Sequence, residues 1–170
     1  MTTLHPTAAA IPGTHDGSHD FDFLFGAWRI VNHRLVRRLA GCTDWETFTA
    51  TQKAWPILGG LGNMDEFRPE QWRPGFIGMT LRLYQSATRC WSIYWMDNQN
   101  VALNPPVTGG WVGDTGIFTG ADVCEGRPVT ARFTWQRLGP DAARWEQDFS
   151  PDDGRTWEKN WVMEFTREGT

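Results

Sequence analysis

The chain has 170 residues, of which 40% are apolar, and its 16 basic and 20 acidic residues give a formal net charge of −4. This composition fits one globular domain and excludes a disordered chain, and the absence of a concentrated basic face argues against nucleic acid as a partner. No run approaches the roughly 20 apolar residues of a membrane helix, and no secretory signal is visible, so we expect a cytoplasmic protein without a membrane partner.

Residues 1–19 are rich in Ala, Thr, Pro, Gly and His and show no sustained period, which predicts a flexible tail in front of a domain over residues 20–168. A short helical turn is expected at Phe21–Phe25. From there on, short runs separated by turn residues predict about ten strands. The expected strands are 27–37, 45–53, 62–67, 76–84, 90–96, one around Trp111, 116–119, 128–136, 144–149 and 157–167.

Most of these strands alternate apolar and polar residues with a period of two, which is typical of an antiparallel sheet with one buried face. About ten short strands of this kind predict an all-β fold, a closed antiparallel up-and-down barrel of about 8–10 strands. The apolar face is expected to line the lumen. That lining is predicted to consist of Trp28, Ile30, Met79, Leu81, Trp91, Trp95, Phe133, Trp135, Trp145, Trp161 and Met163, with Asn32, Asn63, Asp65 and Gln147 as polar anchors.

The strand 90–96 is apolar on both faces, because Tyr94 and Met96 lie opposite Trp91, Ile93 and Trp95. We expect the outer face of this strand to be covered by the N-terminal segment or by a second subunit. Homodimerisation through this face is a hypothesis.

The segment Phe23-Leu24-Phe25-Gly26-Ala27-Trp28 leads into the first expected strand. Its Gly-x-Trp pattern resembles the start of proteins of the calycin superfamily, which includes lipocalins and fatty-acid-binding proteins. The resemblance implies that Gly26 lets the chain turn sharply, that Trp28 plugs one end of the barrel, and that Arg167 lies over this Trp in a cation–π contact. The alternative is an ordinary core Trp after a turn.

From about residue 20 to residue 167 the chain is also similar to a group of uncharacterised bacterial lipocalin-like proteins. The stretches that carry the similarity are 21–28, 58–63 and 145–161. This similarity implies a fold and brings no catalytic residues with it.

The stretch 150–157 matches the Asp-box pattern, Ser-x-Asp-x-Gly-x-Thr-Trp. Its carboxylate can accept backbone N–H bonds within a loop, its Gly supplies a positive φ, and its Trp anchors the hairpin. We expect a single structural hairpin here. The residues assigned to it are Ser150, Asp152, Gly154, Thr156 and Trp157.

Metal and cofactor sites are not expected. The three Cys lie far apart without a CxxC spacing, and the cluster His15–Asp20 falls in the predicted tail, where nothing fixes a metal geometry. No His follows His33, so haem ligation near the last strands is not expected either.

Candidate catalytic residues are Asp65, Glu66 and Tyr94. A carboxylate inside an apolar barrel could move protons, because burial raises its pKa. The adjacent Asp65 and Glu66 point to opposite faces of a strand, and the interpretation we favour places both at the rim of the barrel.

Three functions remain open at this stage. The first is binding of a small apolar or aromatic molecule in the lumen, which requires apolar walls with a few polar anchors. The second is an isomerase or cyclase acting on a hydrophobic, polyketide-like substrate in the same barrel. The third is a structural domain with a filled core. The residues expected to contact a ligand are Asn32, Asn63, Trp91, Trp95, Phe133, Trp135, Trp145, Gln147, Trp161 and Met163.

Overall fold

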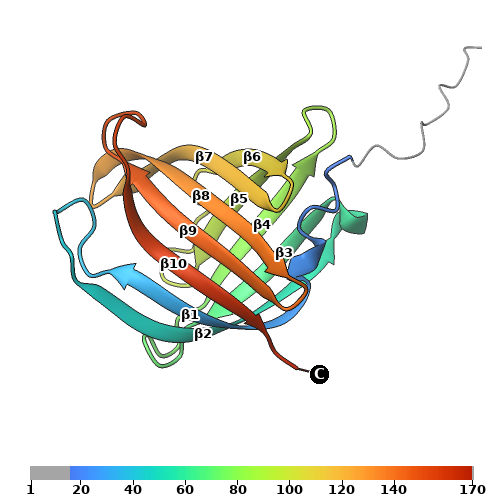
Figure 1. Cartoon of the computed structure of the whole chain (residues 1–170), viewed down its shortest axis with the longest axis horizontal. Coiled ribbons are helices and arrows are strands. Elements are labelled where there is room, and N and C mark those ends of the chain that lie inside the picture. Colours follow the sequence, from blue (N-terminus) through green and yellow to red (C-terminus); the bar gives the residue numbers. More distant parts are fainter. Residues whose placement is uncertain (1–15, 170) are drawn as a thin grey trace, which may run out of the picture.

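A computed structural model describes residues 16–169 of the chain. It consists of strands joined by short loops and two single-turn 3-10 helices, η1 (Asp22–Leu24) and η2 (Leu58–Gly60) (Figure 1). The strands are β1 (Gly26–Leu35), β2 (Trp45–Ile57), β3 (Gly62–Arg68), β4 (Gly78–Gln85), β5 (Cys90–Asp97), β6 (Val107–Val112), β7 (Thr115–Cys124), β8 (Arg127–Gly139), β9 (Ala142–Ser150) and β10 (Glu158–Arg167).

The strands form one closed barrel in which each strand pairs with its neighbours in sequence. Every pairing is antiparallel, and β1 closes the ring by pairing with both β2 and β10. The register aligns Trp28 with Arg167 across the closing pair. The predicted all-β up-and-down barrel is therefore confirmed, and the helical turn expected before the first strand is η1.

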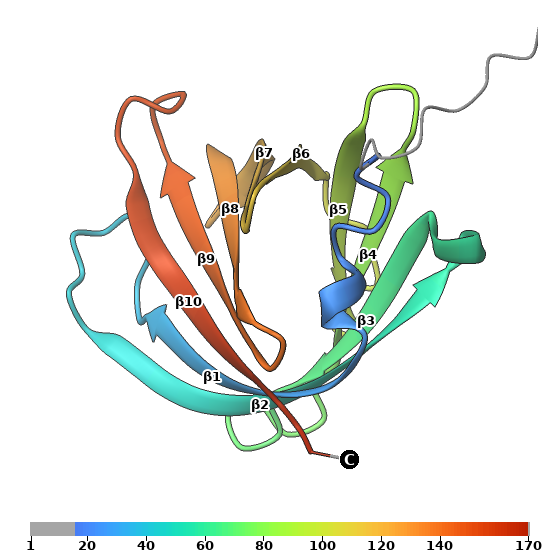
Figure 2. The same ribbon diagram turned by 45° about the vertical axis from the view of Figure 1, so that its right-hand side comes forward.

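One end of the barrel is covered by residues 16–25, and we call it the closed end (Figure 2). Phe21 is fully buried there, with ring centroids 5.1 Å from Trp91 and 5.2 Å from Trp111. Gly17 accepts a hydrogen bond of 2.9 Å from Trp91 Nε1, and Ser18 is buried. Packing against the barrel therefore begins before residue 20, while residues 1–15 of the predicted tail lie outside the described part of the chain.

The opposite end is formed by the loops β1–β2, β3–β4, β5–β6, β7–β8 and β9–β10, and we call it the open end. The β3–β4 loop, residues 69–77, forms no ladder, as Pro69 and Pro74 predict. This loop instead reaches the barrel interior, because the ring of Trp72 stacks on Phe48 of β2 with centroids 4.2 Å apart.

The two faces of β4 are reversed relative to the prediction. Gly78, Arg82 and Tyr84 are buried, whereas Met79 and Leu81 lie on the outer face. The prediction that Met79 and Leu81 line the lumen is therefore wrong. The prediction of the inward face rested on hydrophobicity alone. In the barrel, the inward residues of β4 are instead those that fit beside the large indoles of β5.

Candidate functional site

A cavity of about 360 Å³ occupies the barrel interior on the side of the open end. The β3–β4 and β5–β6 loops contribute to its wall, and no residue of the closed-end segment 16–25 does. Its aromatic wall consists of Phe67, Trp72, Phe76, Trp95, Phe133, Trp135, Trp145, Phe149, Trp161 and Phe165. A volume of this size lies within the range of roughly 300–1,000 Å³ in which small-molecule sites are found.

The rings of this wall hold one another in place. Trp145 packs edge-on against Phe133 at 4.9 Å between centroids, and Trp161 lies 6.2 Å from Trp145. Such edge-to-face contacts add roughly 0.5–1.5 kcal/mol each to the burial of the rings. The Trp161 indole also donates a 3.0 Å hydrogen bond to Asn32 Oδ1, so its orientation is fixed from two sides.

An arginine stands between two of these indoles at the open end. The Arg34 guanidinium lies 5.5 Å from the Trp72 ring and 5.3 Å from the Trp161 ring, and Arg34 Nη1 donates to Glu46 at 2.9 Å. Glu46 also accepts the Trp72 indole N–H at 3.1 Å. Arg34 and Glu46 together attach Trp72, and with it the β3–β4 loop, to the barrel wall.

A buried ion pair lies deeper in the barrel. Arg82 Nη1 approaches Asp65 Oδ2 at 2.6 Å and donates to Asn63 Oδ1 at 3.0 Å, and Arg82 and Asp65 are only 2% and 0% exposed. The prediction that Asp65 lies at the rim is therefore wrong. The predicted inward orientation of Met79 and Leu81 would place Arg82 on the outer face of β4, where it could not be an inner partner for Asp65.

Seven of the ten predicted ligand-contacting residues line the cavity, and three do not. The seven are Trp95, Phe133, Trp135, Trp145, Gln147, Trp161 and Met163. Asn32 and Asn63 are buried and hold Trp161 and Arg82 by hydrogen bonds. Trp91 belongs to the closed end, where it packs against Phe21.

The candidate catalytic residues do not come together. Glu66 and Tyr94 each follow an inward-facing residue of their strand, so they lie on the outside of the barrel. Glu66 is paired there with Arg68. Asp65 alone faces inward, where it is paired with Arg82.

The wall residues that sequence reasoning did not predict include all four of its arginines and one indole, namely Arg34, Arg38, Trp72, Arg73 and Arg82. Arg34 and Arg38 belong to a short basic run, residues 33–38, whose composition alone does not indicate that two of its side chains turn toward the barrel interior. The position of Trp72 and Arg73 depends on how the β3–β4 loop packs, which no local pattern encodes.

The residues assigned to the barrel plug meet at the closed end. Arg167 lies 4.2 Å above the Trp28 ring, and its Nη1 and Nη2 each donate at 2.8 Å to the carbonyls of Phe25 and Phe23. Gly26 has φ +107°, and a Cβ there would come within 3.2 Å of Arg167 Nη1. Glycine therefore suits both the turn into β1 and the close approach of the guanidinium.

The Asp-box residues form a hydrogen-bonded loop between β9 and β10. Asp152 Oδ1 accepts from Ser150 Oγ and from the Thr156 N–H, each at 2.8 Å. Gly154, at φ +85°, accepts the Trp157 indole N–H at 3.0 Å. Hydrogen bonds from Thr156 hold the pKa of Asp152 below its ordinary value. None of these residues lines the cavity.

Two further searches of residues 16–169 bear on the site. No three His, Cys, Asp or Glu side chains in this part of the chain lie close enough together to hold a metal ion. No helix within the same range is long and apolar enough to cross a membrane.

Comparison with known proteins supplies a fold but no family. No family model matches the chain, and no curated protein matches it in sequence. Among solved structures, the barrel is similar to the S-type phycobiliprotein lyase CPES from Guillardia theta, with a TM-score of 0.58 over 88% of this chain and 91% of the lyase. The two sequences are 10% identical, so the similarity is one of architecture.

Proposed function

We propose that this protein binds a small apolar or aromatic molecule in the barrel cavity. The observation that carries the proposal is the 360 Å³ cavity, whose wall includes ten indole and phenyl rings. A structural domain with a filled core would leave no such space. The architecture shared with a phycobiliprotein lyase is consistent with a barrel that receives a ligand.

The enzyme alternative has less support from the geometry. Glu66 and Tyr94 lie outside the barrel, and Asp65 is held by Arg82. None of the three predicted positions therefore provides an unpaired general base that faces the cavity. Binding is the simpler function.

Fluorescence of the protein itself provides the test. Five Trp line the cavity, so a bound aromatic probe such as N-phenyl-1-naphthylamine is expected to quench their emission by energy transfer and to gain fluorescence in the apolar site. Absence of saturable binding for this probe and for its anionic counterpart, 8-anilino-1-naphthalenesulfonate, would contradict the proposed function.

A matched pair of variants shows whether the probe enters the barrel. Thr80 lines the cavity, so Thr80→Phe is expected to fill part of it and weaken probe binding. Thr51 lies exposed on β2, so Thr51→Phe adds the same ring outside the barrel. Equal probe affinity in both variants would place the binding site elsewhere.

A further inference from the structure

Charged side chains lie among the aromatic rings in the wall of the cavity, and most of them are positive. Four arginines line it, at positions 34, 38, 73 and 82, against two aspartates, Asp97 and Asp122. A ligand with only apolar groups would leave these guanidinium groups without a use. The charged side chains of the wall therefore indicate which polar groups the ligand carries in addition to its apolar body.

Two of the four arginines are already neutralised by the protein. Arg34 is paired with Glu46 at 2.9 Å, and Arg82 with Asp65 at 2.6 Å. Within the described residues 16–169, Arg38 and Arg73 have no carboxylate within ion-pair distance. The open end of the cavity thus presents two positive charges that no close carboxylate balances.

These two guanidinium groups are positioned by aromatic rings. Arg73 lies 4.2 Å from the Trp72 ring, and Arg38 lies 5.4 Å from the Phe149 ring. A cation on the face of a ring keeps its N–H donors free at the edges of the guanidinium plane, where they can pair with a planar oxyanion. Both rings also line the cavity, so an anion held here continues directly into the apolar site.

The aspartates of the wall do not replace the missing partners. Asp97 Oδ1 accepts the backbone N–H groups of Gln99 and Asn100 at 2.9 and 2.8 Å, which uses it to fold its own loop. Asp122 accepts the Val123 N–H at 2.7 Å, and burial raises the pKa of its carboxyl. Burial, together with the charge of Arg34, lowers the pKa of Arg38, and the opposing effect of Asp122 and Glu125 offsets this only in part. An anion in direct contact with Arg38 would therefore relieve an unfavourable charge.

The spare hydrogen-bonding capacity of the wall points the same way. Four buried polar atoms of cavity-lining residues have no partner within residues 16–169, and all four are N–H donors. They are Arg34 Nε, Gln52 Nε2, Arg82 Nε and Trp135 Nε1. A wall rich in donors suits a ligand rich in oxygen acceptors, because buried donors gain most from a partner they otherwise lack.

We propose that the ligand of this cavity is an organic acid, with an apolar or aromatic body among the indoles and a carboxylate or similar oxyanion paired with Arg38 and Arg73 at the open end. This inference rests on the proposed function, since it specifies the class of molecule that the cavity takes. A charge-assisted pair of this kind is stronger than a neutral hydrogen bond, and it strengthens further where water is excluded.

The experiment compares two probes that share one skeleton. N-phenyl-1-naphthylamine is neutral, and 8-anilino-1-naphthalenesulfonate adds a single oxyanion. We expect the sulfonate to bind the unmodified protein at least about tenfold more tightly at low salt, with the advantage shrinking as salt screens the charges. The double variant Arg38→Gln/Arg73→Gln is expected to lose this advantage while keeping its affinity for the neutral probe.

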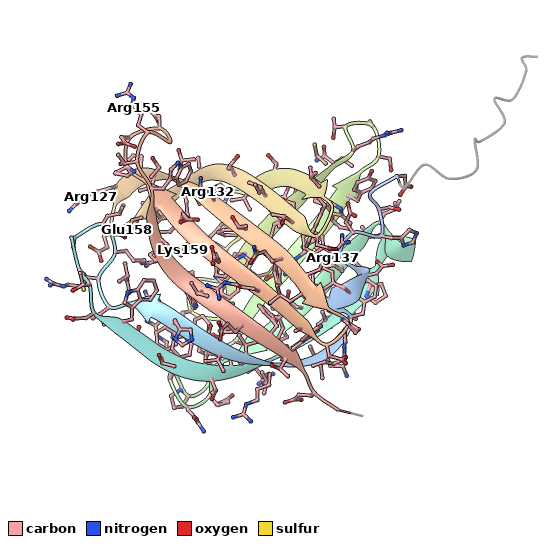
Figure 3. The ribbon with its side chains drawn as sticks, viewed as in Figure 1. Arg127, Arg132, Arg137, Arg155, Glu158 and Lys159 are labelled. Carbon is pink, nitrogen blue, oxygen red and sulfur yellow. The ribbon has the colours of Figure 1, made fainter. Side chains whose placement is uncertain are left out.

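Arg155 supplies the matched control. It lies exposed on the β9–β10 loop and projects away from the barrel (Figure 3), and it does not line the cavity. Arg155→Gln removes one positive charge at the same end of the molecule, so it is expected to leave both affinities unchanged. Equal weakening by Arg155→Gln would mean that net charge, rather than the two arginines, attracts the sulfonate, and this would overturn the inference.

The outcomes separate the inference from the proposed function. If both probes bind equally and the double variant changes neither affinity, the cavity binds ligands but does not select acids, and the inference fails alone. Binding of neither probe overturns both. Arg73 is exposed, so Arg73→Gln alone should fold even if the double variant does not. This single variant is expected to weaken the binding of the sulfonate by about threefold or more and to leave the binding of the neutral probe unchanged. If Arg73→Gln leaves the affinity for the sulfonate unchanged, this result contradicts the inference.

A competition assay extends the test to carboxylates. 2-Naphthoate is expected to displace the bound sulfonate at lower concentration than its neutral isostere 2-naphthamide. Equal displacement by the two compounds would overturn the proposed role of the oxyanion.

Discussion

The buried pair of Arg82 and Asp65 gives the most direct test of the β4 orientation. Replacing Arg82 by Met keeps a side chain of similar length but leaves the Asp65 carboxylate, which is 0% exposed, without the cation 2.6 Å away. Removing one partner of a buried pair costs roughly 3–5 kcal/mol of unfolding free energy. At about 2–4 °C per kcal/mol for a domain of this size, the melting temperature should fall by about 10 °C.

The complete thermodynamic cycle adds Asp65→Leu and the double variant. Replacing both charges by apolar side chains removes the desolvation cost together with the attraction, so the double variant should unfold within about 1–2 kcal/mol of the unmodified protein. Urea unfolding followed by Trp fluorescence and by circular dichroism measures each corner of the cycle. The expected coupling energy between the two residues is at least about 2 kcal/mol.

The same strand β3 offers a control and a clear refutation. Glu66 and Arg68 form an ion pair on the outer face, with side chains 32% and 43% exposed. Arg68→Met should therefore change stability by less than about 1 kcal/mol. If Arg82→Met behaves like Arg68→Met, Arg82 is on the wet face of β4 after all, and the inward orientation of this strand is wrong.

Three further predictions concern other parts of the barrel. Asp152→Ala should lower the melting temperature at pH 7, and the difference should shrink as the pH falls below about 4, because a carboxyl with a depressed pKa contributes stability above its unfolded-state pKa and loses it as the pH falls through the folded-state pKa; equal melting temperatures at pH 7 would contradict this. Arg167→Met should cost roughly 2 kcal/mol in urea unfolding, since it removes a cation–π contact with Trp28 and two hydrogen bonds to carbonyls; a loss below about 0.5 kcal/mol would show that the plug contributes little. If the outer face of β5 joins two subunits, size-exclusion chromatography with light scattering should give a dimer that Leu81→Lys dissociates, whereas a 19.4 kDa monomer at high concentration would exclude it.

Much of the barrel could be predicted because each strand shows a local sequence pattern that does not depend on the rest of the fold. Alternation with a period of two, interrupted by Gly, Pro and Asp turns, located ten strands, most of them close to their observed bounds. The expected strand 116–119 is the exception, because β7 continues to Cys124. In β8, for example, Val129, Ala131 and Trp135 are buried as their alternation predicts. The order of the strands then followed from short connections, since neighbours in sequence pair in an up-and-down barrel.

The open end of the cavity could not be predicted in the same way. Trp72 and Arg73 lie in a loop whose position depends on contacts with β1 and β2, such as the stacking of Trp72 on Phe48. Arg38 lies just beyond β1, in a loop with no period of its own. Residues that meet only through tertiary packing leave no signature in a local window of sequence.

The failure on β4 has a different cause, because the information was present in the sequence. The register sets Thr80 beside Trp95, Arg82 beside Ile93 and Tyr84 beside Trp91. Gly78 faces the same way, and a Cβ there would meet the Trp95 ring at 2.2 Å. A residue larger than Gly at this position would push the indole into the cavity.

Volume therefore decides the orientation of β4 where hydrophobicity points the other way. Turning Met79 and Leu81 inward would crowd the wall that Trp95 already fills, and close-packed interiors do not absorb such an excess. The consequence appears on the outer face, where Leu81 lies in register between Met64 and Tyr94, and Met64 lies beside Trp55. These four side chains are only half-buried. The orientation of β4 that keeps the cavity open thus places a row of apolar side chains at the surface. This row is the physical basis for the homodimer hypothesis at this face.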